Sequence, residues 1–172
     1  MKFGITPAQE ASDYAATLDQ TLLAEELGYD SIWMFEHHGV EHVAGTHYYP
    51  SPLLALGGLA THTTRVLLGS GVLILPFAHP VRVAEEAALL DTMSSGRVIL
   101  GVGTGYRELE FGAFGVPFKE RGARTGEALE VLGRLLTEKN VVHQGRFFTL
   151  NGVSVPSPIQ RPRPPLWVGG WS

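Results

Sequence analysis

The chain has 172 residues, 44% of them hydrophobic, and a formal net charge of −4 at pH 7. This composition is typical of a globular protein with enough apolar side chains for a sizeable core. The 13 Lys and Arg residues form no basic cluster, which argues against nucleic acid as a partner. The absence of cysteine excludes disulfides and thiolate chemistry. Without an apolar run of about 18 residues or a signal-peptide pattern, we expect a cytoplasmic protein that does not enter the membrane.

Residues 1–60 predict two strand–helix units. Residues 2–6 form a short strand, and a helix capped at Ser12 or Asp13 follows and ends at Gly28. Its buried face is expected to hold Ala15, Leu18, Leu22 and Leu23. The apolar run from 31 onward predicts a second strand that ends at residue 38. After a polar loop, Ser51 and Pro52 open a second helix, whose core side is expected to hold Leu53, Leu54, Leu56 and Leu59.

Two further units are predicted in residues 65–138. A third strand covers residues 65–75, and Pro80 opens a helix with apolar residues at helical spacing, namely Val83, Ala87, Leu90 and Met93. The turn at 94–96 closes this helix, and a fourth strand covers 97–102. A glycine-rich loop follows, and a helix is predicted over about 120–138.

The last 30 residues follow a different pattern. Residues 141–165 are proline-rich and predict a hairpin insertion, and 165–170 predict a fifth strand. We therefore expect one α/β domain over residues 1–172, with a parallel sheet of the kind found in (β/α)₈ barrels. Such a barrel needs roughly 250 residues, so four units and a fifth strand amount to the N-terminal half. An open edge is expected to pair with more chain, either in a longer polypeptide or in a homo-oligomer or partner chain.

Titratable side chains follow the second strand. Glu36, His37 and His38 lie at its carboxyl end, which is where parallel α/β folds bind ligands. His37 could accept or donate a proton, or it could be a structural histidine. Glu36 could orient His37 or bind a backbone amide. Because adjacent extended residues face opposite ways, only one of the two histidines is expected to face the pocket.

Glycines interrupt the third strand. The sequence Gly69-Ser70-Gly71-Val72 predicts either an ordinary bulge or a place where a ligand approaches the backbone closely.

Five motifs resemble those of the bacterial luciferase-like superfamily of flavin- or F420-dependent oxidoreductases. They lie, in order, at residues 36–38, 75–80, 89–97, 101–107 and 114–115, and the similarity extends over 1–172. The resemblance implies a TIM barrel that binds FMN, as FMNH2, or coenzyme F420 at its carboxyl face. It also implies a dimer and a monooxygenase that acts on a small organic substrate with O₂. The alternatives are an F420-dependent hydride-transfer reductase or dehydrogenase and a non-catalytic flavin-binding partner subunit or fragment.

The resemblance also implies roles for individual residues. His37 matches the catalytic histidine, with Glu36 beside it, and a cis peptide bond is expected between Gly71 and Val72, beneath the isoalloxazine ring. Thr104 stands where the luciferase α subunit has a phosphate-binding arginine. The loop from Gly101 to Arg107, followed by Glu110 and Phe111, resembles the F420 branch more closely. Arg124 is a further candidate for phosphate binding. The other residues implied at the cofactor or its phosphate are Gly103, Gly105, Arg107, Arg121, Gly169, Gly170 and Ser172.

A metal-dependent hydrolase is an alternative from another class. Imidazoles and carboxylates suit Zn, Mn or Fe, and the chain gathers Glu36, His37, His38, Glu41, His42 and His47. No HExxH pattern supports this alternative, so we expect no metal.

Overall fold

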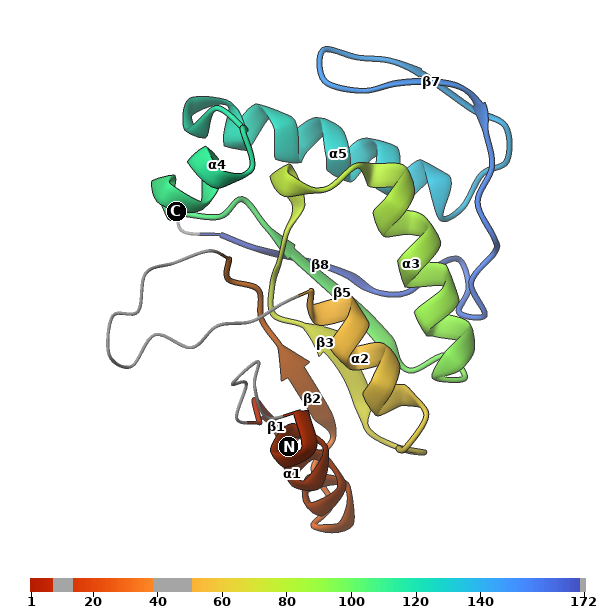
Figure 1. Cartoon of the computed structure of the whole chain (residues 1–172). Coiled ribbons are helices and arrows are strands. Elements are labelled where there is room, and N and C mark those ends of the chain that lie inside the picture. Colours follow the sequence, from red (N-terminus) through yellow and green to blue (C-terminus); the bar gives the residue numbers. More distant parts are fainter. Residues whose placement is uncertain (8–13, 39–50, 171–172) are drawn as a thin grey trace.

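The computed structural model describes residues 1–7, 14–38 and 51–170 (Figure 1). Its centre is a six-stranded sheet in which all strand pairs are parallel. Strands β1 (Gly4–Ile5), β2 (Ser31–Met34), β3 (Leu67–Ser70) and β5 (Val98–Gly103) are neighbours in that order. β5 also pairs with the short β4 (Leu73–Ile74) and with β8 (Leu166–Gly169). The predicted parallel α/β architecture is therefore present.

Helices α1 (Tyr14–Glu26), α2 (Pro52–Ala60), α3 (Pro80–Met93) and α5 (Arg121–Leu135) connect the strands. In Figure 1, α2, α3 and α5 lie in sequence along one face of the sheet. Three shorter elements were not predicted: α4 (Glu108–Ala113), and the 3₁₀ turns η1 (Leu75–Phe77) and η2 (Phe118–Glu120). None of the described helices is long and apolar enough to span a bilayer.

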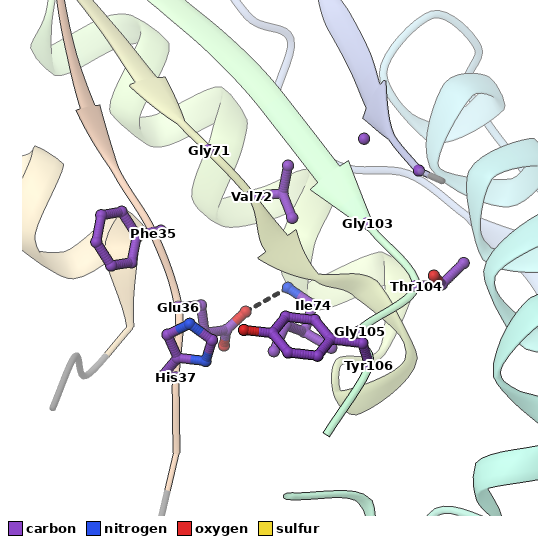
Figure 2. Close-up of a pocket in the computed structure, with 12 residues that line it drawn as sticks. Phe35, Glu36, His37, Gly71, Val72, Ile74, Gly103, Thr104, Gly105 and Tyr106 are labelled. Atoms are coloured by element: carbon purple, nitrogen blue, oxygen red, sulfur yellow. Dashed lines mark hydrogen bonds between the residues drawn. The ribbon is translucent and has the colours of Figure 1, made fainter. Parts of the chain in front are cut away.

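Several predicted strands are shorter than expected, and two of these differences shape the carboxyl edge of the sheet. The third strand divides into β3 and β4 at a cis Gly71–Val72 peptide bond (Figure 2), which confirms the predicted cis bond. The second strand ends at Met34, and among residues 35–38 only His37 still forms an isolated β-bridge.

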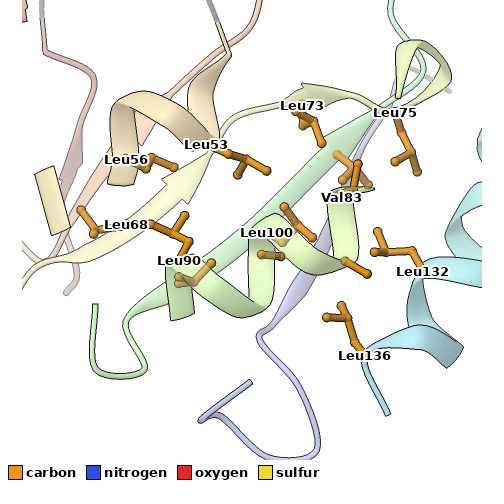
Figure 3. Close-up of a cluster of buried hydrophobic side chains, with 14 of the residues drawn as sticks. Leu53, Leu56, Leu68, Leu73, Leu75, Val83, Leu90, Leu100, Leu132 and Leu136 are labelled. Carbon is orange, nitrogen blue, oxygen red and sulfur yellow. The ribbon is translucent and has the colours of Figure 1, made fainter. Parts of the chain in front are cut away.

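The core lies between the sheet and helices α2, α3 and α5 (Figure 3). Leu68 and Leu100 of the sheet are fully buried, and so are Leu56 of α2 and Leu132 of α5. Burying a leucine side chain contributes roughly 1.5–3 kcal/mol, so this layer supplies much of the stability. The predicted core positions that are buried are Leu53, Leu56, Leu59, Val83, Ala87 and Leu90.

Some predicted core positions were wrong. Leu54 is 75% exposed and Met93 42% exposed, because each lies on the side of its helix that faces away from the sheet. On α1 the buried residues are Thr17, Thr21 and Ala24, a stripe of small side chains. Of the predicted face of α1, Leu18 is partly buried against the core, whereas Ala15, Leu22 and Leu23 are exposed.

The predicted hairpin is formed by β6 (Val141–Gln144) and β7 (Thr149–Val153), which pair antiparallel beside α5 (Figure 1). The chain then returns along α3, where the backbone N–H of Gln160 donates to the buried carboxylate of Asp91 at 2.8 Å. This contact directs the following residues into β8, which supplies one wall of the site.

Candidate active site

A cavity of about 290 Å³ opens where β2, β3, β5 and β8 end (Figure 2). This is the edge at which parallel α/β folds bind ligands. Four segments that are distant in sequence meet there, and the residues that line the cavity are Phe35, Glu36, His37, Gly71, Val72, Ile74, Gly103, Thr104, Gly105, Tyr106, Gly169 and Gly170.

His37 presents an imidazole to this cavity. Its Nδ1 lies 3.1 Å from Oε1 of Glu110, and its side chain is 19% exposed. Its Nε2 makes no hydrogen bond to any described residue. The ring of Tyr106 stands nearly perpendicular to the His37 ring, with the two ring centres 6.1 Å apart. One nitrogen of His37 is therefore anchored in protein, and the other is available to a ligand.

Glu36 and His38 form a separate pair. Oε1 of Glu36 lies 2.6 Å from Nε2 of His38, and its Oε2 accepts a hydrogen bond from the backbone N–H of Ile74, drawn in Figure 2. Of the two predicted alternatives for Glu36, the structure shows the contact to a backbone amide, together with His38, and no hydrogen bond among the described residues joins Glu36 to His37. The His38 ring packs 4.6 Å from that of Phe114. The prediction that the adjacent histidines face different ways is confirmed.

Sequence reasoning assigned no role to Glu110. This residue lies on α4 and is 1% exposed, and its Oε1 accepts from the backbone N–H of His38 as well as contacting His37. Its Oε2 is buried and has no hydrogen-bond partner in the part of the chain that the structure describes. The sequence offered one indication of this residue, because an acidic side chain stands directly before Phe111 in the segment after the glycine-rich loop. A helix of six residues is too short for periodicity to show which acid is buried.

The floor of the cavity depends on glycine. A Cβ on Gly103 would lie 2.6 Å from Cγ2 of Val72, and one on Gly169 would lie 2.9 Å from Cγ1 of the same side chain. Both are closer than real carbon contacts. Val72 therefore packs directly on the backbones of β5 and β8, which leaves a smooth floor at the cis Gly71–Val72 bond.

The structure places the predicted cofactor residues in two groups. Those that line the cavity are Gly71, Val72, Gly103, Thr104, Gly105, Gly169 and Gly170. The predicted arginines do not line it. Arg107 lies over the Tyr106 ring at 5.7 Å, Arg121 lies over the Phe118 ring at 3.9 Å, and Arg124 donates to the carbonyl of Pro76. Ser172 lies outside the described residues.

Within residues 1–7, 14–38 and 51–170, no cluster of side chains supports the alternative of a metal site. No three His, Asp or Glu side chains there could hold a metal ion. Three residues of the alternative, Glu41, His42 and His47, lie outside the described residues.

Fold and cavity together define a class. A parallel sheet curved as part of a (β/α)₈ barrel, with a cis peptide and an available imidazole at its carboxyl edge, is the arrangement expected of a luciferase-like enzyme. The family model described as luciferase-like monooxygenase matches residues 1–172, so the chain belongs to this family.

Three relatives illustrate the range of the family. The chain is 32% identical to the oxygenase component of the flavin-dependent trigonelline monooxygenase of Acinetobacter baylyi, over 90% of the chain and 42% of that protein. It is 34% identical to the F420-dependent glucose-6-phosphate dehydrogenase of Intrasporangium calvum, over 96% of the chain and 50% of that protein. The crystal structure of monooxygenase RslO1 from Streptomyces bottropensis superposes with a TM-score of 0.87 at 34% identity, over 98% of the chain and 53% of RslO1.

The chain thus spans about half the length of these relatives. The predicted fold is confirmed: the chain holds about half of a luciferase-like TIM barrel. The relatives are named as both flavin-dependent and F420-dependent enzymes.

Proposed function

We propose that this chain forms the cofactor-binding part of a luciferase-like monooxygenase that uses reduced FMN and O₂ to oxygenate a small organic substrate. The observation that carries the proposal is the glycine-based floor at Gly71–Val72, with the available Nε2 of His37 beside it. A flat ring system needs such a floor, and a proton-transferring group must lie at its edge to act on a bound substrate.

The lining residues fit this cofactor in chemistry. Phe35, Val72 and Ile74 offer apolar contacts to a ring and help to exclude water. Thr104 and Gly105 offer a hydroxyl and backbone amides, which suit the phosphate of the cofactor. Gly169 and Gly170 leave room on the same side. The remaining wall would come from further residues or from a second chain.

The chain's own residues would bind the cofactor, orient the substrate and transfer a proton. When bound, the reduced flavin supplies the electrons that activate O₂. Nε2 of His37 would accept a proton from the substrate and hold it. Glu36, tied to Ile74 and His38, would keep the end of β2 against β4.

An F420-dependent hydride transfer is the second candidate, with a reduction or an alcohol oxidation as its reaction. Thr104 lines the cavity at the position where the luciferase α subunit has an arginine. The 34% identity to an F420-dependent dehydrogenase also favours this second candidate. In that reaction His37 would take the hydroxyl proton of an alcohol, and F420, when bound, would supply the hydride-accepting chemistry.

Titration of the purified protein with FMN, FMNH₂ and F420 tests the proposal, with loss of cofactor fluorescence as the readout where the cofactor fluoresces. Saturable binding of FMN or FMNH₂ that weakens in Thr104→Ala, but not in Thr137→Ala on the far side of the molecule, supports the flavin reaction. Preference for F420 selects the second candidate. Binding of either cofactor with no turnover would indicate a flavin-binding subunit, and failure of a folded protein to bind any of them would overturn the proposal.

A further inference from the structure

Tyr106 places a phenol at the mouth of the cavity. The residue lines the cavity and is 64% exposed, and Figure 2 shows its hydroxyl end turned toward the side that holds Glu36 and His37. We propose that Tyr106 determines substrate specificity: its hydroxyl donates a hydrogen bond to the oxygen of a hydroxyl-bearing organic substrate, whose own proton faces Nε2 of His37. This inference rests on the proposed acid–base role of His37.

The position of the phenol is fixed by its surroundings. Gly105 has a φ of +72°, a left-handed conformation that suits glycine, and an added Cβ there would lie 2.8 Å from Cγ2 of Ile74. The loop therefore packs directly on Ile74, which sets the point where the Tyr106 side chain leaves the backbone. The Arg107 guanidinium lies 5.7 Å from the Tyr106 ring centre, within the range of a cation–π contact. Since the His37 ring meets the same ring at 88°, the phenol is held from two sides.

Few polar groups of the cavity are free to bind a substrate. Both oxygens of Glu36 are occupied, one by the Ile74 backbone and one by His38. By contrast, the hydroxyl of Tyr106 and Nε2 of His37 make no hydrogen bond to any described residue. In a pocket lined mainly by apolar groups and glycine, a few placed polar groups set the orientation and identity of the ligand. Tyr106 and His37 are therefore the pair that would read the substrate.

A hydroxyl group complements this pair. Its oxygen accepts a hydrogen bond from the Tyr106 O–H, and its proton is donated to the lone pair of an imidazole nitrogen. When Nε2 of His37 takes the proton, the substrate O–H bond breaks, an N–H bond forms, and the electron pair stays on the substrate oxygen. Tyr106 keeps its own proton and stabilises the negative charge, because a hydrogen bond to an ionised oxygen is stronger than one to a neutral oxygen. A molecule without the hydroxyl leaves both protein groups unpaired and binds less tightly.

Calorimetric titration of the FMN-loaded protein with 4-nitrophenol and with nitrobenzene, which lacks the hydroxyl, tests the proposal. We expect the parent protein to bind 4-nitrophenol about tenfold more tightly than nitrobenzene. Tyr106→Phe should remove most of this preference and leave the affinities for nitrobenzene and FMN near the parental values, because the ring remains. Tyr29→Phe is the matched control, since Tyr29 precedes β2 and so lies at the opposite edge of the sheet. It should keep the preference.

The ionisation of bound 4-nitrophenol is a second readout, because the ionised form absorbs visible light. A donor at its oxygen favours the ionised form, so Tyr106→Phe should lower the ionisation constant of the bound probe by about tenfold. An apolar role for the Tyr106 ring predicts no such change.

Three results would each overturn the inference. They are equal binding of the two probes by the parent protein, an unchanged preference in Tyr106→Phe, and an unchanged ionisation constant in that variant. A loss of FMN affinity in Tyr106→Phe with the preference intact would assign the hydroxyl to the cofactor and overturn it as well. If the protein binds no cofactor, the proposed function fails, and the same titrations of the unloaded protein still decide the role of Tyr106.

Discussion

Glu110 and Glu127 are both carboxylates that contact a histidine, and they satisfy their oxygens in opposite ways. Glu127, on α5, accepts from the backbone N–H groups of Arg146, Phe147 and Phe148 at 2.8–3.1 Å. It also lies 3.3 Å from Nε2 of His143, and its side chain is 13% exposed. Both of its oxygens are used to hold the β6–β7 hairpin on α5. Among the described residues, Glu110 uses one oxygen, toward the cavity histidine and the backbone N–H of His38.

The comparison distinguishes Glu127, whose hydrogen bonds stabilise the fold, from Glu110, whose position suits a role in the chemistry of the cavity. Burial opposes ionisation of Glu127, but the hydrogen bonds from Phe148, Phe147, His143 and Arg146 outweigh it and lower its pKa. Glu25, which accepts from the backbone of residues 64–66, has its pKa lowered in the same way. We infer that substitutions around the cavity chiefly change activity, and substitutions around the hairpin chiefly change stability.

The largest effect is expected from removal of the cavity histidine. His37→Ala should lower kcat by about 10²- to 10⁴-fold, the contribution of a positioned acid–base group, and should leave cofactor affinity nearly unchanged. The matched control is His143→Ala, which removes the histidine beside Glu127. Steady-state kinetics should show near-parental kcat in the control, and equal losses in the two variants would remove the distinction between the regions.

The next effect concerns the floor of the cavity. Gly103→Ala should push Val72 into the space above β5, because the added Cβ would lie 2.6 Å from Cγ2 of Val72. We expect cofactor affinity to fall by about tenfold, which corresponds to about 1.4 kcal/mol. Gly133→Ala on α5, where an added Cβ would meet no described atom within 4 Å apart from its chain neighbours and its own helix backbone, is the control. Fluorescence titration measures both, and parental affinity in Gly103→Ala would place the cofactor elsewhere.

These two sites differ in how far sequence could predict them. His37 follows an apolar strand, and parallel topology brings every strand end to one edge, so its place in the cavity was predictable. Glu110 contacts a partner 73 positions away in sequence, from a helix too short to show a buried face. The exposed Leu54 shows a similar limit on the fold, because periodicity marks apolar positions and does not indicate which of them the sheet covers.

A smaller effect is expected at the hairpin. Glu127→Gln replaces one acceptor oxygen by a donor that faces backbone N–H groups, which should lower the free energy of unfolding by about 1–3 kcal/mol. Cofactor-dependent kcat should stay near the parental value. Urea denaturation measures the loss, with the 62%-exposed Glu130 changed to Gln as the control. A stability loss of the same size in the control would contradict the role of the hydrogen bonds.

The smallest effect is a dependence of stability on pH. The lowered pKa values of Glu25 and Glu127 mean that the unfolded chain binds more protons at these sites than the folded one. Their contribution is complete above the usual carboxyl pKa of 4.5 and is lost as pH falls from there through the lowered values. Urea denaturation at a series of pH values should show this decline, and Glu127→Gln should reduce it. An undiminished decline in that variant would exclude Glu127 as a source.

The most direct test of the comparison is the free energy of unfolding of Glu110→Gln measured beside that of Glu127→Gln. Glu110→Gln replaces a buried carboxylate, one oxygen of which has no partner among the described residues, with a neutral amide. Residues that serve function often lower the stability of the folded protein. We therefore predict that Glu110→Gln is at least as stable as the parent protein, while Glu127→Gln is less stable. Destabilisation of Glu110→Gln to the same extent as Glu127→Gln would show that Glu110 serves the fold, and would contradict the account.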